Sequence, residues 1–433
     1  MIPEIETKSE QDIKEFQEVK LKEALGYLSE QSPFYQRLFK TYQIDISDIQ
    51  TLEDLIKIPT TSKEDLQQYN DDFICVPKHN IIDYSTTSGT LGQPVTFALS
   101  DKDLDRLAYN EAISFACAGV QSEDIIQLMT TMDRRFMAGL AYFLGARQLG
   151  TGIIRVGAGV PELQWDSILK FKPTYLIAVP SFLIKLIEHA KSYRIDINAL
   201  GIKGAICIGE PIRNADFSLN TLGELIHKNW NIKMFSTYAS TEMSTAFTEC
   251  EAQQGGHHHP ELVITEILDD QNQPVSKGDI GELTITTLGV EAMPLLRFKT
   301  GDMVQAHNSK CSCGRKTMRL GPLVGRKQQM IKYKGTTLYP PAILNILNQF
   351  KTLDAFIIEI SHNPLGMDNL HIKLTSAHPT DDLLQTIQDQ FRATLRVVPT
   401  IEFCDLAIIQ KLQYSETDRK RRLVVDRRTE HNS

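Results

Sequence analysis

The stretch "TYLIAVPSFLIKLIEHAKSYRIDINALGIKGAICIGE" (residues 174–210) has the pattern of a strand, a helix and a second strand. "TYLIAV" and "GAICIGE" are short, continuous apolar runs, whereas "PSFLIKLIEHAKSYR" between them is longer and amphipathic. Two similar apolar runs, "DIIQLM" and "GIIRVG", precede this unit in the chain. Strands that alternate with helices predict an α/β fold with a mostly parallel, doubly wound sheet, whose ligands bind at the carboxyl ends of the strands.

The flanking segments predict further parts of the fold. Residues 10–40 place apolar side chains at three- and four-residue intervals, which indicates helices. Between "ELVITEILDD" and "LRFKTGDMVQ", short alternating strands separated by turn signals predict a small β-barrel-like subdomain at about residues 260–322. After "GRKQQMIKYKG" strands and helices alternate again, which predicts an α+β domain. We therefore expect a large N-terminal domain, residues 1–325, and a smaller C-terminal domain, residues 326–433.

Composition excludes several classes of protein. The 433 residues are 42% hydrophobic and 23% charged, as in ordinary globular proteins, and no apolar run is long enough to cross a bilayer. The start, "MIPEIETKSEQDIKEF", lacks the features of a secretory signal, which predicts a cytoplasmic protein. A formal net charge of −8 argues against general binding to nucleic acid. Seven scattered cysteines favour reduced thiols or a metal site over a disulfide framework.

A loop rich in serine, threonine and glycine, "STTSGTLGQP" at residues 85–94, follows a predicted strand. Successive backbone N–H groups in such a loop can bind an anion, and hydroxyl groups add donors. The loop does not match the Walker pattern, which ends in Gly-Lys-Ser/Thr. On its own it is either a phosphate-binding loop without a lysine or a polar turn.

Four further segments follow this loop in a fixed order: "GEP" (209–211), "YASTE" (238–242), "GELTITTLGVEAMPLLRFKTGD" (281–302) and "GRKQQMIKYKG" (325–335). The ordered set resembles the adenylate-forming ligases, and among them the phenylacetate–CoA ligase family. The resemblance covers the chain from about Ser85 to Asp426, and residues 281–302 are its most specific part. It implies an ATP-dependent ligase that adenylates an aryl or arylacetic acid and transfers the acyl group to coenzyme A, with release of AMP and pyrophosphate.

The resemblance also implies a role for each motif. In the phosphate loop, Ser85, Thr86, Thr87, Ser88, Gly89 and Thr90 would wrap the β- and γ-phosphates of ATP. Gly209, Glu210 and Pro211 would line the purine pocket, and Tyr238 would flank the adenine, followed by Ala239, Ser240 and Thr241. Glu242 would hold magnesium, Asp302 would bind the ribose hydroxyls, and Arg326 would lie near the ribose and α-phosphate. Taken singly, Glu242 is typical of a surface carboxylate, Asp302 of a turn former and Arg326 of a solvated side chain, and only the joint order of the motifs favours the functional roles.

A catalytic lysine completes the family's site near the C-terminus. Here "SETDRKRRLVVD" aligns from Asp426 and puts Lys420 in that place, although the family's "RSEGK"-like segment is not preserved. Arg419, Arg421 or Arg422 could therefore be mistaken for it. A lysine suits the role because it is a compact point charge.

A second cluster concerns metal. Cys250 precedes "QQGGHHHP", and "CSCGR" supplies Cys311 and Cys313, so three thiols and one imidazole could complete a tetrahedral zinc site. His257 has the spacing of the family's histidine, and His258 and His259 are rivals for the same place. A closed site with four protein ligands would be structural.

Three departures from the family pattern keep alternatives open. Gln93 replaces the lysine of the loop, Gln329 replaces the aspartate of the hinge on which the C-terminal domain is thought to swing, and Ala239 replaces a glycine. The acyl group could pass to a carrier-protein thiol instead of coenzyme A, or the chain could be a degenerate nucleotide-binding protein. The sequence does not identify the acid that is activated. Phe136, Met137 and Ala239 are candidate residues of the acid-binding pocket. The resemblance alone suggests a homodimer.

Overall fold

The computed structural model describes residues 2–87, 95–334, 336–363, 367–413 and 422–428. The chain divides into two compact units, Met1–Thr300 with Val304–Leu323, and Gly301–Met303 with Val324–Ser433. Among the described residues, no helix combines the length and the apolar character needed to cross a membrane.

The first unit contains the predicted mostly parallel sheet, with the strand order β4-β3-β5-β6-β7-β8. Neighbouring strands from β4 to β7 are parallel, and β8 adds an antiparallel edge. The strands are β3 (Ile125–Leu128), β4 (Gly152–Arg155), β5 (Tyr175–Ala178), β6 (Gly204–Cys207), β7 (Lys233–Ser240) and β8 (Thr245–Thr248).

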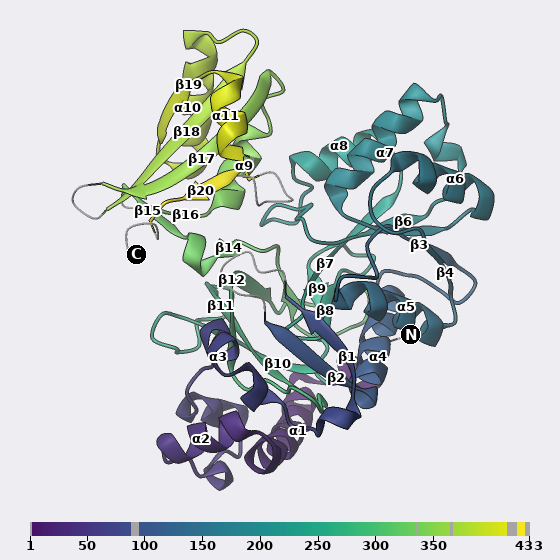
Figure 1. Cartoon of the computed structure of the whole chain (residues 1–433), viewed down its shortest axis with the longest axis vertical. Helices are drawn as coiled ribbons and strands as arrows, with labels where there is room; N and C mark the ends of the chain where they lie inside the picture. Colours follow the sequence, from purple (N-terminus) through teal and green to yellow (C-terminus); the bar gives the residue numbers. More distant parts are fainter. Residues whose placement is uncertain (1, 88–94, 335, 364–366, 414–421, 429–433) are drawn as a thin grey trace. The chain divides into compact units, whose positions relative to one another are not determined.

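Helices cover both faces of this sheet (Figure 1). Successive residues of a strand point to opposite faces, so that Leu176 and Ala178 of β5 pack with one hydrophobic cluster and Ile177 with the other. The first cluster includes Trp165 and Leu183 from two of the covering helices. The helices are α4 (Asp101–Cys117), α5 (Met137–Leu149), α6 (Pro161–Phe171), α7 (Pro180–Ser192) and α8 (Thr221–Asn229).

The predicted small β subdomain is an antiparallel sheet. Its order is β10-β11-β12-β13-β9, with β14 paired to β12, and this path is linear among the described residues, not a closed barrel. The strands are β9 (Gly256–His257), β10 (Val263–Leu268), β11 (Ile280–Thr287), β12 (Phe298–His307), β13 (Arg319–Leu320) and β14 (Gly325–Arg326).

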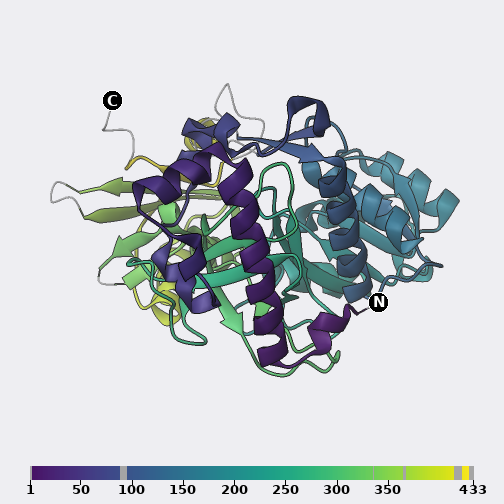
Figure 2. The same cartoon turned by 90° about the horizontal axis from the view of Figure 1, so that it is seen from below.

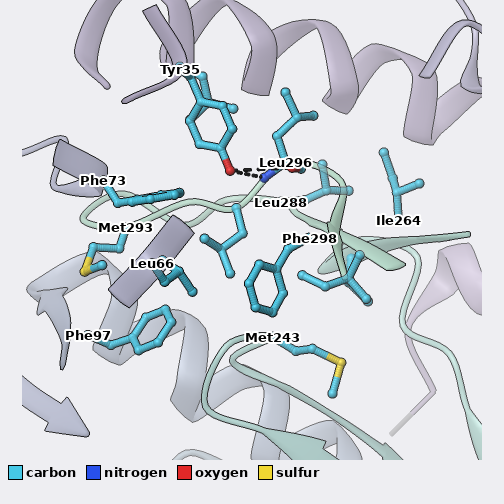
Figure 3. Close-up of a cluster of buried hydrophobic side chains, with 14 of the residues drawn as sticks. Tyr35, Leu66, Phe73, Phe97, Met243, Ile264, Leu288, Met293, Leu296 and Phe298 are labelled. Atoms are coloured by element: carbon cyan, nitrogen blue, oxygen red, sulfur yellow. Dashed lines mark hydrogen bonds between the residues drawn. The ribbon is translucent and has the colours of Figure 1, made fainter. Parts of the chain in front are cut away.

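The N-terminal helices α1 (Glu10–Gln31), α2 (Pro33–Thr41) and α3 (Lys63–Gln68) pack against this antiparallel sheet and the hairpin β1 (Ile81–Thr86)–β2 (Thr96–Ser100). Figure 2 shows α1, in purple, in front of the green strands of this sheet, and the Gln17 amide donates to the carbonyls of Pro260 and Val263. Tyr35 is fully buried, and its hydroxyl accepts a 2.8 Å hydrogen bond from the Leu296 N–H (Figure 3). The helical entry is therefore part of the main hydrophobic core.

The second unit has its own core around a four-stranded sheet with the order β19-β18-β17-β20. Pairing of β17 with β18 is antiparallel, whereas β20 and β19 join this pair in parallel. The elements are β15 (Ile331–Tyr333), β16 (Thr336–Leu338), α9 (Pro340–Leu347), β17 (Leu353–His362), β18 (Asp368–Ser376), α10 (Asp381–Leu395), β19 (Thr400–Phe403), α11 (Leu406–Gln413) and β20 (Val424–Asp426).

Candidate active site and metal centre

Two of the predicted nucleotide-binding segments leave the same edge of the parallel sheet. Gly209–Pro211 follow β6 and Tyr238–Glu242 close β7, and these strands are parallel neighbours with Cys207 opposite Ser236. Gly209 has a φ of +75°, which glycine adopts without strain. The carboxylate of Glu210 accepts hydrogen bonds from the backbone N–H and hydroxyl of Ser181, at 2.8 and 2.9 Å. Glu210 thereby caps the first turn of α7, a contact that local sequence did not indicate.

The turn between β7 and β8 presents Glu242. The Met243 side chain is fully buried in the main core (Figure 3), and the Met243 N–H donates to the Ser240 hydroxyl at 3.3 Å. The Ser244 N–H bonds the Ser240 carbonyl at 3.2 Å and closes the turn. Glu242 itself is partly exposed, between this anchored methionine and Thr241. A partly exposed carboxylate on a turn fixed in this way offers the oxygen ligands that a hard cation such as magnesium prefers.

The predicted phosphate loop begins on the β1–β2 hairpin. Thr86 pairs with Thr96, and the hairpin closes where the Thr87 N–H bonds the Val95 carbonyl at 3.0 Å and the Val95 N–H bonds the Thr87 hydroxyl at 3.1 Å. The Thr86 N–H donates to the carbonyl of Arg135 at 2.9 Å, and the buried Ser85 hydroxyl faces Asp83 at 3.3 Å. Ser88, Gly89, Thr90 and Gln93 lie outside the described residues.

Asp302 and Arg326 come together in the second unit. They are opposite each other in the β12–β14 pairing, and Arg326 Nε lies 3.7 Å from Asp302 Oδ1. Two residues far apart in sequence, both predicted to bind the nucleotide, are therefore neighbours. Lys420 lies outside the described residues.

The candidate pocket residues Phe136 and Met137 stand at the start of α5. Phe136 is 38% exposed, whereas Met137 is buried, and its sulfur lies 3.9 Å from the Ser244 hydroxyl. Ala239 is opposite Ala246 in the β7–β8 pairing. Met137 thus touches the same turn that carries Glu242.

The structure brings together the four predicted zinc ligands. One donor atom each from Cys250, His257, Cys311 and Cys313 lies within 4.8 Å of all the others. The Cys250 and Cys311 sulfurs are 3.5 Å apart, and Cys313 Sγ is 3.4 Å from His257 Nε2. In a tetrahedral zinc site with Zn–S bonds of about 2.3 Å, two sulfurs stand about 3.8 Å apart. The donor set and its spacing therefore fit a metal ion.

Contacts around this cluster select the histidine. His257 Nδ1 lies 3.2 Å from the Thr317 hydroxyl, which orients Nε2 toward the thiols, as second-shell partners of metal-binding histidines do. His258 Nε2 instead bonds the Val263 carbonyl, and His259 Nδ1 contacts Glu6. His257 is thus the histidine of the cluster, while its two rivals have other partners.

The electrostatics of the cluster favour a thiolate. Burial opposes ionisation of the Cys313 thiol, but the hydrogen bond with His257 and the nearby Arg315 guanidinium outweigh it and lower the pKa of Cys313 to about 5. Burial raises the pKa of Cys250 to about 12. Metal binding requires deprotonated sulfur, and the lowered pKa of Cys313 is in keeping with that requirement.

Comparison with known proteins supplies the family. The model of the family described as "AMP-binding enzyme" matches residues 30–292. A phenylacetate–coenzyme A ligase of Thermus thermophilus is 31% identical over 350 residues, which cover 80% of this chain and 77% of that protein. The chain belongs to the AMP-binding enzymes, in their phenylacetate–coenzyme A ligase family. A phenylacetate–coenzyme A ligase of Escherichia coli is also similar to this AMP-binding enzyme, at 27% identity over 86% of the chain and 84% of the relative.

Solved structures agree with this fold. The crystal structure of 2-hydroxyisobutyryl-CoA ligase in the postadenylation state superposes with a TM-score of 0.83, at 24% identity, over 98% of this chain and 91% of that one. The α/β adenylate-forming fold predicted for this AMP-binding enzyme is confirmed, as is the prediction of an AMP-forming acid–CoA ligase. Two buried residues near the site, Arg106 and Glu6, lie in no recognisable motif. Arg315 ends the "CSCGR" motif, but its bond to Glu6 has no local signal in the sequence.

Proposed function

We propose that this AMP-binding enzyme activates an aromatic carboxylic acid, aryl or arylacetic, with ATP and transfers the acyl group to coenzyme A. The observation that carries the proposal is the 31% identity to a phenylacetate–coenzyme A ligase over 80% of the chain. The placement of the motifs supports the proposal, because residues 209–211 and 238–242 follow neighbouring parallel strands and the phosphate loop begins on the β1–β2 hairpin.

The chemistry proceeds in two steps. A carboxylate oxygen of the acid attacks the α-phosphorus of ATP, the bond to the β-phosphate oxygen breaks, and pyrophosphate leaves. The thiol of coenzyme A then attacks the acyl carbon, loses its proton, and AMP departs with the bridging oxygen. Positioned donors and cations are worth most where charge develops, which is why both steps depend on prearranged loops.

Each motif has a proposed part in these steps. The terminal phosphates are held by the phosphate loop, Ser85, Thr86, Thr87, Ser88, Gly89 and Thr90. The adenine lies between Glu210 and Tyr238, and the ribose and α-phosphate are bound by Asp302 and Arg326. Lys420 bridges the carboxylate of the acid and the α-phosphate. Glu242 would hold magnesium, which would supply positive charge to the phosphates. Cys250, His257, Cys311 and Cys313 would hold zinc, which would join two segments distant in sequence and stabilise the fold.

The proposal is tested by acid-dependent exchange of labelled pyrophosphate into ATP with a broad panel of aryl, arylacetic and aliphatic acids. We expect faster exchange with aromatic acids than with aliphatic acids. Absence of exchange with every acid would reject the proposal and favour a binding protein without turnover.

A second acceptor follows from the replacement of the hinge aspartate by Gln329. Hinge residues set the rate of domain motion, and a carrier-protein thiol could then replace coenzyme A as the acceptor. Supplying coenzyme A and a phosphopantetheinyl carrier in parallel separates the two acceptors, because only the true one consumes the adenylate rapidly.

A further inference from the structure

A buried arginine on α4 joins three loops of the first unit. Arg106 Nε donates to the Leu288 carbonyl at 2.7 Å, Nη1 to the Ser244 carbonyl at 2.6 Å, and Nη2 to the Leu262 carbonyl at 2.6 Å and the Thr245 hydroxyl at 3.1 Å. Leu288 follows β11, Leu262 precedes β10, and Ser244 and Thr245 end the turn that begins at Glu242.

This arrangement places a charge in the interior, and no carboxylate among the described residues forms an ion pair with it. Arg106 is 8% exposed, and none of these four acceptors is a carboxylate. Burial lowers the pKa of Arg106 to about 10, so that the guanidinium still carries its charge at neutral pH. Asp103 and Glu261 favour the charge electrostatically but do not outweigh its burial. Burying a charge is costly, and an apolar side chain would fill the same volume without that cost. The cost indicates that the hydrogen-bond geometry itself is needed.

The geometry acts on the Glu242 turn at two points. Ser244 adopts a left-handed backbone conformation, with a φ of +49°, which is strained for a serine and persists only where the surroundings enforce it. Arg106 holds the carbonyl of this residue. The Thr245 hydroxyl, which accepts from Arg106, donates in turn to the Met243 carbonyl at 3.1 Å. The hydrogen-bond chain therefore ends one residue from Glu242.

The same helix fixes the following strand. Asn110 lies one turn beyond Arg106 on α4, and its side-chain oxygen accepts from the Ala246 N–H at 3.0 Å. Ala246 is opposite Ala239 of β7, so α4 holds β8 in register beside the predicted adenine-binding strand. Because α4 and β8 pack directly, movement of the turn would require breaking both contacts.

We propose that Arg106 is a positioning residue for the reaction, whose guanidinium sets the Glu242 turn and thereby the carboxylate through which magnesium-bound ATP is held. The inference rests on the proposed function, since it takes Glu242 as the magnesium ligand. Arg106 does not contact the reacting atoms in this scheme. Its effect is on how tightly magnesium and ATP bind together, and only secondarily on the chemical step.

The test measures the Mg²⁺ dependence of pyrophosphate exchange in Arg106→Lys, with Glu242→Gln and the double variant. We expect Arg106→Lys to raise the half-saturating Mg²⁺ concentration about tenfold, with turnover at saturating Mg²⁺ within about threefold of wild type, since a lysine cannot reproduce the forked geometry. In the double variant, the Mg²⁺ constant should equal that of Glu242→Gln alone, because residues acting through one another are not additive. The stabilisation of the melting temperature by ATP with Mg²⁺ should shrink in parallel.

Two matched variants separate positioning from loss of stability. Arg297→Lys alters another buried arginine, paired with Glu266 at 2.8 Å, and should lower the melting temperature without moving the Mg²⁺ constant. Thr245→Val removes only the hydroxyl that links Arg106 to the Met243 carbonyl, and it should raise the half-saturating Mg²⁺ concentration about threefold. This variant replaces Arg106→Lys as the test if Arg106→Lys does not fold.

An unchanged Mg²⁺ constant in Arg106→Lys, or in Thr245→Val where that variant stands in, would overturn the inference, as would additive effects in the double variant. These outcomes presuppose exchange by the wild-type enzyme. If the wild type exchanges with no acid, the proposed function fails, and the stabilisation by ATP with Mg²⁺, compared with ATP alone, still decides the role of Arg106.

Discussion

At the scale of single residues, the phosphate loop poses a question of charge, because Gln93 stands where the family has a lysine. The donors that remain are backbone N–H groups and the hydroxyls of the loop. We expect Gln93→Lys to lower the Michaelis constant for ATP up to about fivefold with little change in turnover, since a solvated ion pair contributes about 1 kcal/mol. Gln93→Met, which adds no charge, is the control. An unchanged constant in Gln93→Lys would mean that this position does not face the phosphates.

The metal cluster is also decided by single side chains. We expect one zinc ion per chain by elemental analysis of the purified protein. Cys311→Ser should lose that ion and melt several degrees lower, because metal binding to a closed site contributes to folding. Cys404→Ser changes a cysteine outside the cluster and should keep the ion. Equal zinc content in the two variants would contradict the assignment.

The sequence indicated the ligand types of this cluster but not its surroundings. Cys-x-Cys and the histidine run are local signals, whereas the choice of His257 depends on Thr317, which is 60 residues away in the chain. Likewise, Arg315 Nε bonds the buried Glu6 carboxylate across 309 positions. Contacts of this separation leave no periodic trace in a single sequence.

At the scale of elements, α4 and α5 enclose an unusual carboxyl group. Gly145 of α5 lies so close to Glu111 of α4 that an added Cβ at Gly145 would overlap the Glu111 side chain. Glu111 accepts from the Asn110 amide at 3.0 Å and is 6% exposed. Burial raises the pKa of Glu111 from its ordinary value of 4.5 to about 8.

This helix interface makes stability depend on pH. A raised pKa means that the folded state binds a proton that the unfolded state releases, so the contribution of Glu111 is complete below pH 4.5 and is lost as the pH rises to about 8. The side chain in Glu111→Gln stays neutral at every pH. As the pH rises through this window, the free energy of unfolding of the variant should therefore increase relative to that of the wild type by a few kcal/mol, and its melting temperature should rise relative to the wild type. Glu23→Gln, at an exposed position, should run parallel to the wild type. Parallel curves for Glu111→Gln would show that the carboxyl is ionised in the folded protein.

Elements were predictable where one local pattern decides them. The strands β3 to β6 are short and mostly apolar, and the helices between them are amphipathic, so the alternation of strands and helices along the chain follows from the sequence. The β subdomain was predicted as barrel-like, but its strands form a linear path among the described residues. Strand closure depends on register and twist, which alternation alone does not specify.

At the scale of the whole molecule, the order of the motifs along the chain indicates the family, which the similarity to known ligases confirms. The hydrophobic core that supports them was less accessible, because it joins Tyr35 of α2 to Leu296 near β12, 261 residues apart. The helical entry was predicted, yet its place against the antiparallel sheet required the structure. The family and its activity could thus be predicted from the order of local motifs, whereas the packing of the core could not, because long-range contacts leave no pattern in a single sequence.

The central claim is that the enzyme forms an acyl-adenylate. Its most direct test uses an aromatic acid from the exchange panel, labelled with ¹⁸O in both carboxylate oxygens, with ATP and coenzyme A, and measures the mass of the AMP and pyrophosphate released. The account predicts AMP that carries one labelled oxygen and pyrophosphate that carries none, because the carboxylate oxygen attacks the α-phosphorus and stays with AMP. Unlabelled AMP, or label in pyrophosphate, would contradict it.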